Sequence, residues 1–118
     1  MHHVILGTGP AGVIAADTLR KHDENVRITL IGDENEPPYS RMAIPYFLSG
    51  DIGEAGTYLR QDPDHYKNQG VEIIHARAGA LDIKGKTIAL EGGSEVKYDR
   101  LLLATGASPI RPPVEGLD

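Results

Sequence analysis

The chain has 118 residues, which is enough for one domain and too few for two independent domains. Its composition, with 40% hydrophobic and 25% charged residues, is that of a soluble globular chain and excludes a disordered or fibrous one. The net charge of -5 argues against a nucleic-acid partner, and no apolar run approaches the ~20 residues of a membrane-spanning helix. The lack of cysteine excludes thiol chemistry within the chain and fits the cytoplasm, where we expect the protein.

The first 32 residues are predicted to form a strand, a helix and a second strand. Residues 3–6 are a short apolar run that stops at a glycine, as a buried strand of a parallel sheet does. Small helix-forming residues followed by a basic end predict a helix over residues 10–22. β-Branched residues at 26–31 predict the second strand, which Gly32 ends. The three elements make a βαβ unit, whose crossover we expect to be right-handed.

The middle of the chain combines a long irregular stretch with a short helix. Residues 33–56 are rich in proline and glycine and too long for an ordinary connection, so we expect them to be functional or partly helical. Residues 62–70 predict one short helix, with Asp62 as the N-cap, proline at the first helical position and glycine at the end. We expect His65 to lie in the solvated first turn of this helix. A third strand follows at 71–75.

The last third of the chain predicts a small antiparallel layer and one more buried strand. Runs at 80–83 and 87–90 flank residues 84–86 and predict a hairpin, with 95–98 as a possible third member. Residues 100–104 form an apolar strand, after which prolines prevent regular structure. The sequence therefore predicts the α/β class, with a parallel sheet and a small antiparallel β insertion.

The glycines between the first strand and the first helix match the G-x-G-x-x-G pattern. This pattern assigns Gly7 to the tight turn, Gly9 to the space for a pyrophosphate, and Gly12, together with the small Ala16, to close packing of helix and sheet. The helix that starts there faces a phosphate with unpaired N–H groups and a partial positive charge. A strand before, a helix after and an acid ~20 residues further on separate this motif from a plain glycine-rich turn.

The acidic residue of this motif is Asp33 or Glu34, directly after the second strand. A carboxylate at that place can accept hydrogen bonds from the ribose of an adenosine. It fits FAD or NAD and disfavours a 2′-phosphate. The alternative role, a solvated loop charge, holds for at least one of Asp33, Glu34 and Glu36.

Three blocks of the sequence resemble the FAD-dependent pyridine nucleotide-disulfide oxidoreductases, in particular the N-terminal FAD-binding segment of the rubredoxin, ferredoxin and nitrite reductase flavoproteins. The blocks are residues 4–12, 31–41 and 98–109, and the resemblance covers essentially the whole chain. It implies a Rossmann-like, three-layer FAD/NAD(P)-binding domain that is incomplete. Residues 1–110 would be its N-terminal part, and residues 111–118 a linker toward a missing NAD(P)H-binding domain.

The same resemblance implies which residues hold FAD. The glycine turn would bind the pyrophosphate, the acid the ribose, and the Ala-Thr-Gly block near the end of the chain would close the site. Arg41 matches a basic residue near the flavin or its pyrophosphate, and Ala78 a position whose backbone meets the adenine. The implied cofactor-binding residues are Gly7, Gly9, Pro10, Ala11, Gly12, Asp33, Glu34, Arg41, Ala78, Thr105 and Gly106. No catalytic residue and no metal site are expected in this chain.

Two departures from the family pattern affect the expected chemistry. Pro45 and Tyr46 stand where reductases of iron–sulfur partners have a Ser-Lys pair whose lysine approaches the flavin. Met42 stands where relatives that reduce peroxide, oxygen or coenzyme A disulfide have a reactive cysteine, and a thioether cannot form a thiolate. Tyr39 and Tyr46 could either stack on the flavin or pack the loop.

The resemblance implies an NAD(P)H-dependent flavoprotein oxidoreductase that passes electrons from NAD(P)H through FAD to an acceptor, without a redox-active cysteine in this segment. NAD(P)H would be bound outside this chain, and a small redox protein is one candidate acceptor. The 118 residues alone are expected to be inactive and to self-associate through an uncovered sheet edge. Two alternatives stay open, an NAD-binding Rossmann module of a dehydrogenase and a non-catalytic nucleotide-binding module.

Overall fold

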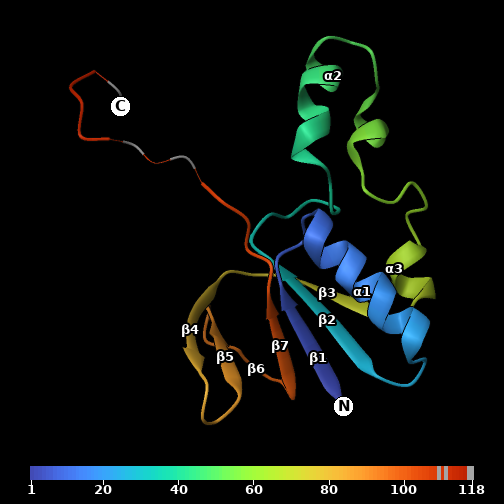
Figure 1. Cartoon of the computed structure of the whole chain (residues 1–118), viewed down its shortest axis with the longest axis vertical. Helices are drawn as coiled ribbons and strands as arrows, with labels where there is room; N and C mark the ends of the chain where they lie inside the picture. Colours follow the sequence, from blue (N-terminus) through green and yellow to red (C-terminus); the bar gives the residue numbers. More distant parts are fainter. Residues whose placement is uncertain (109, 111, 117–118) are drawn as a thin grey trace.

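The computed structural model describes residues 1–108, 110 and 112–116, and arranges them around two sheets (Figure 1). A parallel sheet has the strand order β3-β2-β1-β7, and a separate antiparallel sheet has the order β4-β5-β6. The strands are β1 (His2–Leu6), β2 (Arg27–Gly32), β3 (Val71–His75), β4 (Ala78–Asp82), β5 (Thr87–Leu90), β6 (Glu95–Lys97) and β7 (Arg100–Leu103). This arrangement confirms the predicted α/β class with its small antiparallel insertion.

β1 lies at the centre of the parallel sheet, with β2 on one side and β7 on the other. Its register with β2 runs from His2 opposite Arg27, and its register with β7 runs to Leu6 opposite Leu103. The chain moves from β1 to β2 through a helix, continues to β3, and reaches β7 only after the three strands of the antiparallel sheet. The direction in which strands are added therefore reverses at β1.

Helix α1 (Pro10–His22) follows β1 and covers one face of the parallel sheet (Figure 1). Proline stands at its first position, where a missing N–H costs nothing, and the basic residues 20–22 fill its last turn. Its buried side is made of small residues, namely Gly12, Val13 and Ala16. The helix can therefore lie close to the strands.

Alternate residues of β1 face two different halves of the core. Val4 and Leu6 pack with Ile88 and Leu90 of the antiparallel sheet, so that sheet covers the second face of the parallel one. Ile5 packs on the opposite side with residues of α1 and of β2. Helices, parallel sheet and antiparallel sheet form the three expected layers, and β1 is buried on both faces as its continuous apolar run predicts.

The stretch after β2 leaves the sheet as a helical excursion, which we define as residues 38–59. It contains η1 (Arg41–Ala43), α2 (Ile44–Leu48) and η2 (Glu54–Thr57), and stands away from both sheets in Figure 1. Its two ends are joined at the base, because the Ser40 N–H donates to the Thr57 C=O at 2.8 Å and the Leu59 N–H to the Pro38 C=O at 3.0 Å. The expected partly helical segment is thus a closed loop with its own turns.

The structure corrects the bounds of the short helix before β3. α3 covers only His65–Asn68, whereas the sequence predicts residues 62–70. Asp62 does not cap this helix; its side chain accepts the N–H of Asp64 at 2.9 Å and forms a turn that precedes it. The predicted strand at 80–83 starts earlier, at Ala78, and has an irregular register between Ala78 and Ala80.

Two expectations about the chain as a whole stay predictions. The boundary between residues 1–110 and a linker at 111–118 is not tested, and residues 111, 117 and 118 lie outside the part that the structure describes. Within the described residues, no helix is both long and apolar enough to cross a membrane.

Candidate functional site

The candidate site lies at the carboxyl ends of β1, β2 and β7, where the direction of strand addition reverses. In open parallel sheets this is the place where ligands bind. The turn after β1 is held between its neighbours: the Gly7 N–H donates to the Ile31 C=O of β2 at 2.8 Å, and the Ala104 N–H donates to the Leu6 C=O at 2.8 Å. The glycine turn and the Ala-Thr-Gly block, far apart in sequence, therefore meet.

The glycines of the turn differ in what a side chain would meet. Gly7 has φ +123°, and a Cβ there would lie 1.9 Å from the Ala104 carbonyl oxygen. A Cβ on Gly12 would lie 2.1 Å from the Gly7 carbonyl oxygen. A Cβ on Gly9, in contrast, would have no atom within 4 Å. The turn is thus tightly packed on its inner side and open at Gly9.

The N-terminus of α1 faces this opening. Gly9 is its N-cap and offers no side chain to the first turn, and Pro10 carries no N–H. The N–H groups of Ala11 and Gly12 are consequently available to an anion, with the partial positive charge of a 13-residue helix behind them. An open backbone position beside uncapped N–H groups fits a pyrophosphate.

Gly32 joins this turn, although the sequence pattern gives it only the role of ending a strand. A Cβ on Gly32 would lie 2.5 Å from the Thr8 Oγ1. The end of β2 therefore also closely approaches the glycine turn, at the side chain of Thr8. On the β7 side, Gly106 has φ +75°, which favours glycine in the block that borders the turn.

The two candidate ribose acids have different surroundings. Asp33 is exposed, whereas the Glu34 side chain is half-buried. Glu34 Oε2 accepts the Tyr39 hydroxyl at 2.6 Å, Oε1 is paired with the Arg41 guanidinium, and its backbone C=O contacts His75 Nδ1 at 2.8 Å. The hydrogen bond to Glu34 raises the pKa of Tyr39. Glu34 thus ties the end of β2 to the start of the excursion.

Arg41 and the tyrosines have local roles in the structure. The Arg41 guanidinium carbon lies 5.6 Å from the centre of the Tyr39 ring, within cation–π range. Tyr39 also forms a β-bridge with Tyr58, so it packs the base of the excursion. Tyr46 on α2 is 59% exposed. Of the two tyrosines, Tyr39 takes the packing role, whereas most of Tyr46 is exposed.

Ala78 begins β4 and packs against the core shared by β1 and β5. Its position follows β3 by two residues, at the edge where the parallel sheet ends. The contact of its backbone with an adenine stays a prediction.

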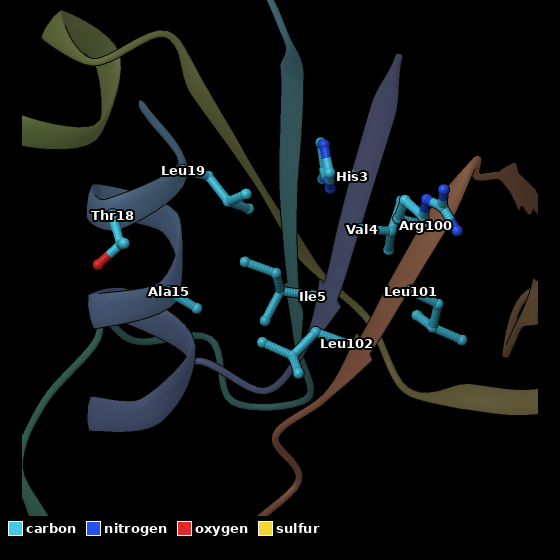
Figure 2. A pocket seen from close by; sticks show the side chains of 9 residues that line it. All are labelled: His3, Val4, Ile5, Ala15, Thr18, Leu19, Arg100, Leu101 and Leu102. Atoms are coloured by element: carbon cyan, nitrogen blue, oxygen red, sulfur yellow. The ribbon is translucent and has the colours of Figure 1, made fainter. Parts of the chain in front are cut away.

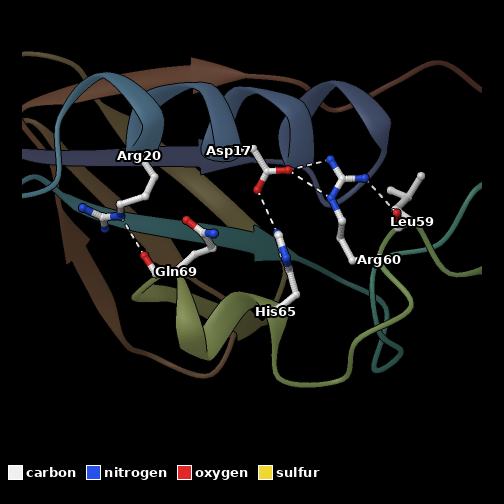
Figure 3. A network of polar contacts seen from close by, with 6 residues as sticks. All are labelled: Asp17, Arg20, Leu59, Arg60, His65 and Gln69. Carbon is white, nitrogen blue, oxygen red and sulfur yellow. Dashed lines mark hydrogen bonds and ion pairs between the residues drawn. The ribbon is translucent and has the colours of Figure 1, made fainter.

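The structure also brings together three residues that the sequence analysis did not connect. Asp17 of α1 contacts His65 Nε2 at 3.0 Å and accepts two bonds from Arg60, from Nε at 3.0 Å and Nη2 at 2.5 Å (Figure 3). The His65 side chain is 22% exposed, so the expected solvated position is wrong. Burial by itself would raise the pKa of Asp17, but the hydrogen bonds from His65 and Arg60 outweigh it and lower that pKa.

A mostly apolar cavity of about 360 Å³ lies on the helix side of the sheet, between α1, β1 and β7. Ile5, Leu19 and Leu102 line it (Figure 2). Leu102 is 45% exposed, because β7 is the last strand of the sheet and has no neighbour on its outer side among the described strands. This surface lies apart from the glycine turn.

The sequence model of the family described as pyridine nucleotide-disulphide oxidoreductase matches residues 1–118. The chain belongs to this family. Membership of this family supports FAD as the cofactor. The open backbone at Gly9 and the uncapped N–H groups fit the pyrophosphate of FAD. The expected family, fold and cofactor are confirmed.

Similar proteins within this family are oxidoreductases. The chain is 36% identical to an NADH oxidase of Methanocaldococcus jannaschii, over 100% of its own length and 28% of the relative's. It is 35% identical to a rubredoxin-NAD(+) reductase of Pseudomonas putida, over 96% of its own length and 30% of the relative's. The structure of a covalent putidaredoxin reductase–putidaredoxin complex aligns with TM-score 0.89 and 33% identity, over 98% of this chain and 28% of the aligned one.

The chain thus spans less than a third of the length of these relatives. The structure of an NAD-dependent persulfide reductase from A. fulgidus aligns equally well, with TM-score 0.89 and 30% identity, over 100% of this chain and 23% of that one. The names of these similar proteins differ in the electron acceptor that they state.

Proposed function

We propose that this chain is the FAD-binding segment of an NAD(P)H-dependent flavoprotein oxidoreductase, which passes electrons from NAD(P)H through FAD to an acceptor. One observation carries the proposal: Gly9 is open while Gly7 and Gly12 on either side are closed by backbone oxygens, at the point where β1, β2 and β7 end. This shape fits a pyrophosphate that approaches the backbone of the turn.

The chain's own residues bind and orient the cofactor. The N–H groups of Ala11 and Gly12 donate to the pyrophosphate, and Gly9 leaves room for it. Asp33 or Glu34 accepts the ribose hydroxyls, and Arg41 approaches the flavin or its pyrophosphate. The remaining proposed contacts come from Gly7, Pro10, Ala78, Thr105 and Gly106. When bound, FAD supplies the redox chemistry, accepting two electrons from NAD(P)H and releasing them to the acceptor.

A small redox protein is the acceptor that we propose. The rubredoxin and ferredoxin reductases among the relatives support it. NAD(P)H binds to a part of the protein outside these residues, because one glycine fingerprint holds one dinucleotide. The 118 residues alone are then inactive, and a cytoplasmic location stays a prediction.

Self-association of the isolated chain is a separate proposal. Among the described strands β7 is the last of the parallel sheet, and Leu102 beside the apolar cavity is 45% exposed. An uncovered edge next to an apolar surface promotes contact between copies.

The test replaces Gly9 by Ala in the full-length protein. A Cβ fits there without touching protein atoms but fills the space proposed for the pyrophosphate, so we expect FAD to be lost while the FAD-free variant keeps the thermal stability of the FAD-free parent protein. Gly53→Ala is the matched control: that glycine is also an N-cap with open space around it, but lies in the excursion. Retention of FAD by Gly9→Ala, or a purified protein that carries NAD and no flavin, would overturn the proposal.

A further inference from the structure

The contact between Asp17 and Arg60 differs from the other ion pairs of the described residues. Both Asp17 oxygens are used, one by Arg60 and one by His65, and the side chains of Asp17 and Arg60 are 27% and 32% exposed. The pair Arg27–Glu72, in contrast, is 3.6 Å long with both side chains more than half exposed. Exposed pairs of that kind contribute little, whereas a partly buried, charge-assisted contact fixes geometry.

Arg60 connects this carboxylate to the base of the excursion. While Nε and Nη2 donate to Asp17, Nη1 donates to the C=O of Leu59 at 2.8 Å (Figure 3). Leu59 in turn donates its N–H to Pro38, where the other end of the excursion begins. The Arg60 guanidinium group therefore contacts both Asp17 of α1 and the backbone of Leu59 at the base of the excursion.

The excursion carries residues of the proposed FAD site. Tyr39 and Arg41 follow Pro38 directly, and both contact the Glu34 carboxylate. The glycine turn lies at the N-terminus of α1, and Asp17 follows Pro10 by seven residues on the same helix, about 10 Å along its axis. A single rigid helix thus presents the phosphate-binding turn at its start and holds the excursion by its third turn.

We propose that Asp17 is a positioning residue of the FAD site, which acts through Arg60 to fix the base of the excursion against α1 and so sets the place of Arg41 relative to the glycine turn. This inference rests on the proposed function as far as FAD is concerned. A hydrophobic contact at the same place would hold the two elements together but would not fix their orientation, which the fork of the guanidinium does.

Arg20 provides the control on the same helix, one turn after Asp17. Its Nε donates to the C=O of Gln69 at 2.7 Å (Figure 3). Its Nη1 donates to the C=O of Glu24 at 2.9 Å. It therefore ties α1 to the end of α3 without contacting the excursion. Arg20→Gln removes the contact between α1 and Gln69, whereas Asp17→Asn weakens the contact between α1 and Arg60 at the base of the excursion.

The experiment compares Asp17→Asn, Arg60→Gln, their double variant and Arg20→Gln in the full-length protein. We expect FAD to dissociate about three- to thirty-fold faster from the first two variants, and the double variant to be no worse than either, because all three lose the same contact. Hydrogen exchange should rise in residues 41–57 of the FAD-free protein. Arg20→Gln should leave both quantities unchanged. Arg60→Lys, which keeps the charge but not the fork, should restore FAD retention only in part.

The outcomes separate this inference from the proposed function. If the protein binds FAD and Asp17→Asn changes dissociation no more than Arg20→Gln does, the positioning role is wrong and the proposed function stands. If the full-length protein binds no FAD, the proposed function is wrong. The rate of hydrogen exchange in residues 41–57 then still decides whether Asp17 fixes the base of the excursion. Should Asp17→Asn not fold, Arg60→Lys gives the same decision through the same two measurements.

Discussion

Glu34 and Asp33 are neighbours with the same charge, but only one of them has free access to a ligand. Both carboxylate oxygens of Glu34 are used by Tyr39 and Arg41, while Asp33 is exposed beside it. A ribose can therefore reach Asp33 without breaking a contact, and can reach Glu34 only in exchange for one. We therefore propose Asp33 in preference to Glu34 as the ribose acid.

Replacement of both acids by Ala should weaken FAD binding to the full-length protein. Each charge-assisted hydrogen bond to a ribose hydroxyl contributes ~1.5–3 kcal/mol, so we expect a loss of that order for each bond removed. Titration of the FAD-free variant with FAD, followed by flavin fluorescence, measures the change. Glu36→Ala, an exposed acid of the same loop, is the control. Unchanged binding by the double variant would remove both acids from the ribose site.

Asp17 should make the thermal stability of the protein depend on pH in the acidic range. Its pKa in the folded state is lowered below the ordinary value of 3.8, so the stabilising contribution is complete above that value and is lost as the pH falls through the folded pKa. Asp17→Asn lacks the contribution at every pH. Thermal unfolding at a series of pH values should therefore show a difference between the two proteins that is largest near neutral pH and shrinks in strong acid. A difference that grows with acidity would contradict the assignment.

The contacts of single residues were predictable where they depend on local chain geometry. Gly7, Gly9 and Gly12 follow from the turn between a strand and a helix, and the neighbours of their Cβ positions agree with that pattern. Their contacts with FAD stay predictions. Asp17 and Arg60 are 43 residues apart, and neither lies in a motif, so only the folded chain brings them together. No pattern in the sequence marks this pair.

Among the elements, the helices of the excursion carry large apolar side chains that are exposed. Met42 is 82% exposed and Leu48 77%, so α2 and η1 present apolar groups to their surroundings and not to the core of the described residues. Met42 occupies the position at which the family resemblance places a reactive cysteine in some relatives. The excursion thus carries an accessible thioether and no thiol.

Met42→Leu should leave flavin reduction nearly intact in the full-length protein, because the side chains have similar volume and neither can be oxidised to a disulfide. Anaerobic titration with NADH should take two electrons per FAD if no other redox centre is present, whereas a flavin paired with a cysteine pair would take four. Loss of flavin reduction by Met42→Leu with FAD still bound would show that the thioether has a redox or positioning role.

Regular elements could be predicted better than the connections between them. Helix α1 starts and ends where its proline and basic residues indicate, at Pro10 and His22. α3 is shorter than predicted because Asp62 bonds within its own turn instead of capping a helix. The excursion has neither apolar periodicity nor a long helix, and hydrogen bonds between its ends define it, so its shape could not be read from local pattern.

At the scale of the whole molecule, the parallel sheet is covered unequally. β1 and β2 are covered by helices on one face and by the antiparallel sheet on the other, whereas β7 exposes Leu102 and Leu103 beside the cavity. The layers themselves were predictable from the alternation of strands and helices and from the family resemblance. The exposed surface at β7 depends on which strand is last in the sheet, which strand patterns alone do not specify.

The isolated 118-residue chain should therefore self-associate. We expect sedimentation velocity to find dimers or larger species, and Leu102→Glu to shift the distribution toward the monomer by placing a charge on the apolar edge. Leu48→Glu is the control, since it removes an exposed leucine from α2, away from β7. A monomeric chain that also unfolds cooperatively and holds FAD would contradict this expectation.

The closed base of the excursion has a consequence for how such proteins diversify. Because Pro38 and Leu59 are joined by their own backbone, the length and composition of the chain between them can change without moving β2 or α3. Insertions, deletions and new reactive groups beyond Arg41 would leave the contacts of Tyr39 and Arg41 with Glu34 in place. We expect exchange of residues 42–57 between family members to transfer acceptor preference while FAD stays bound.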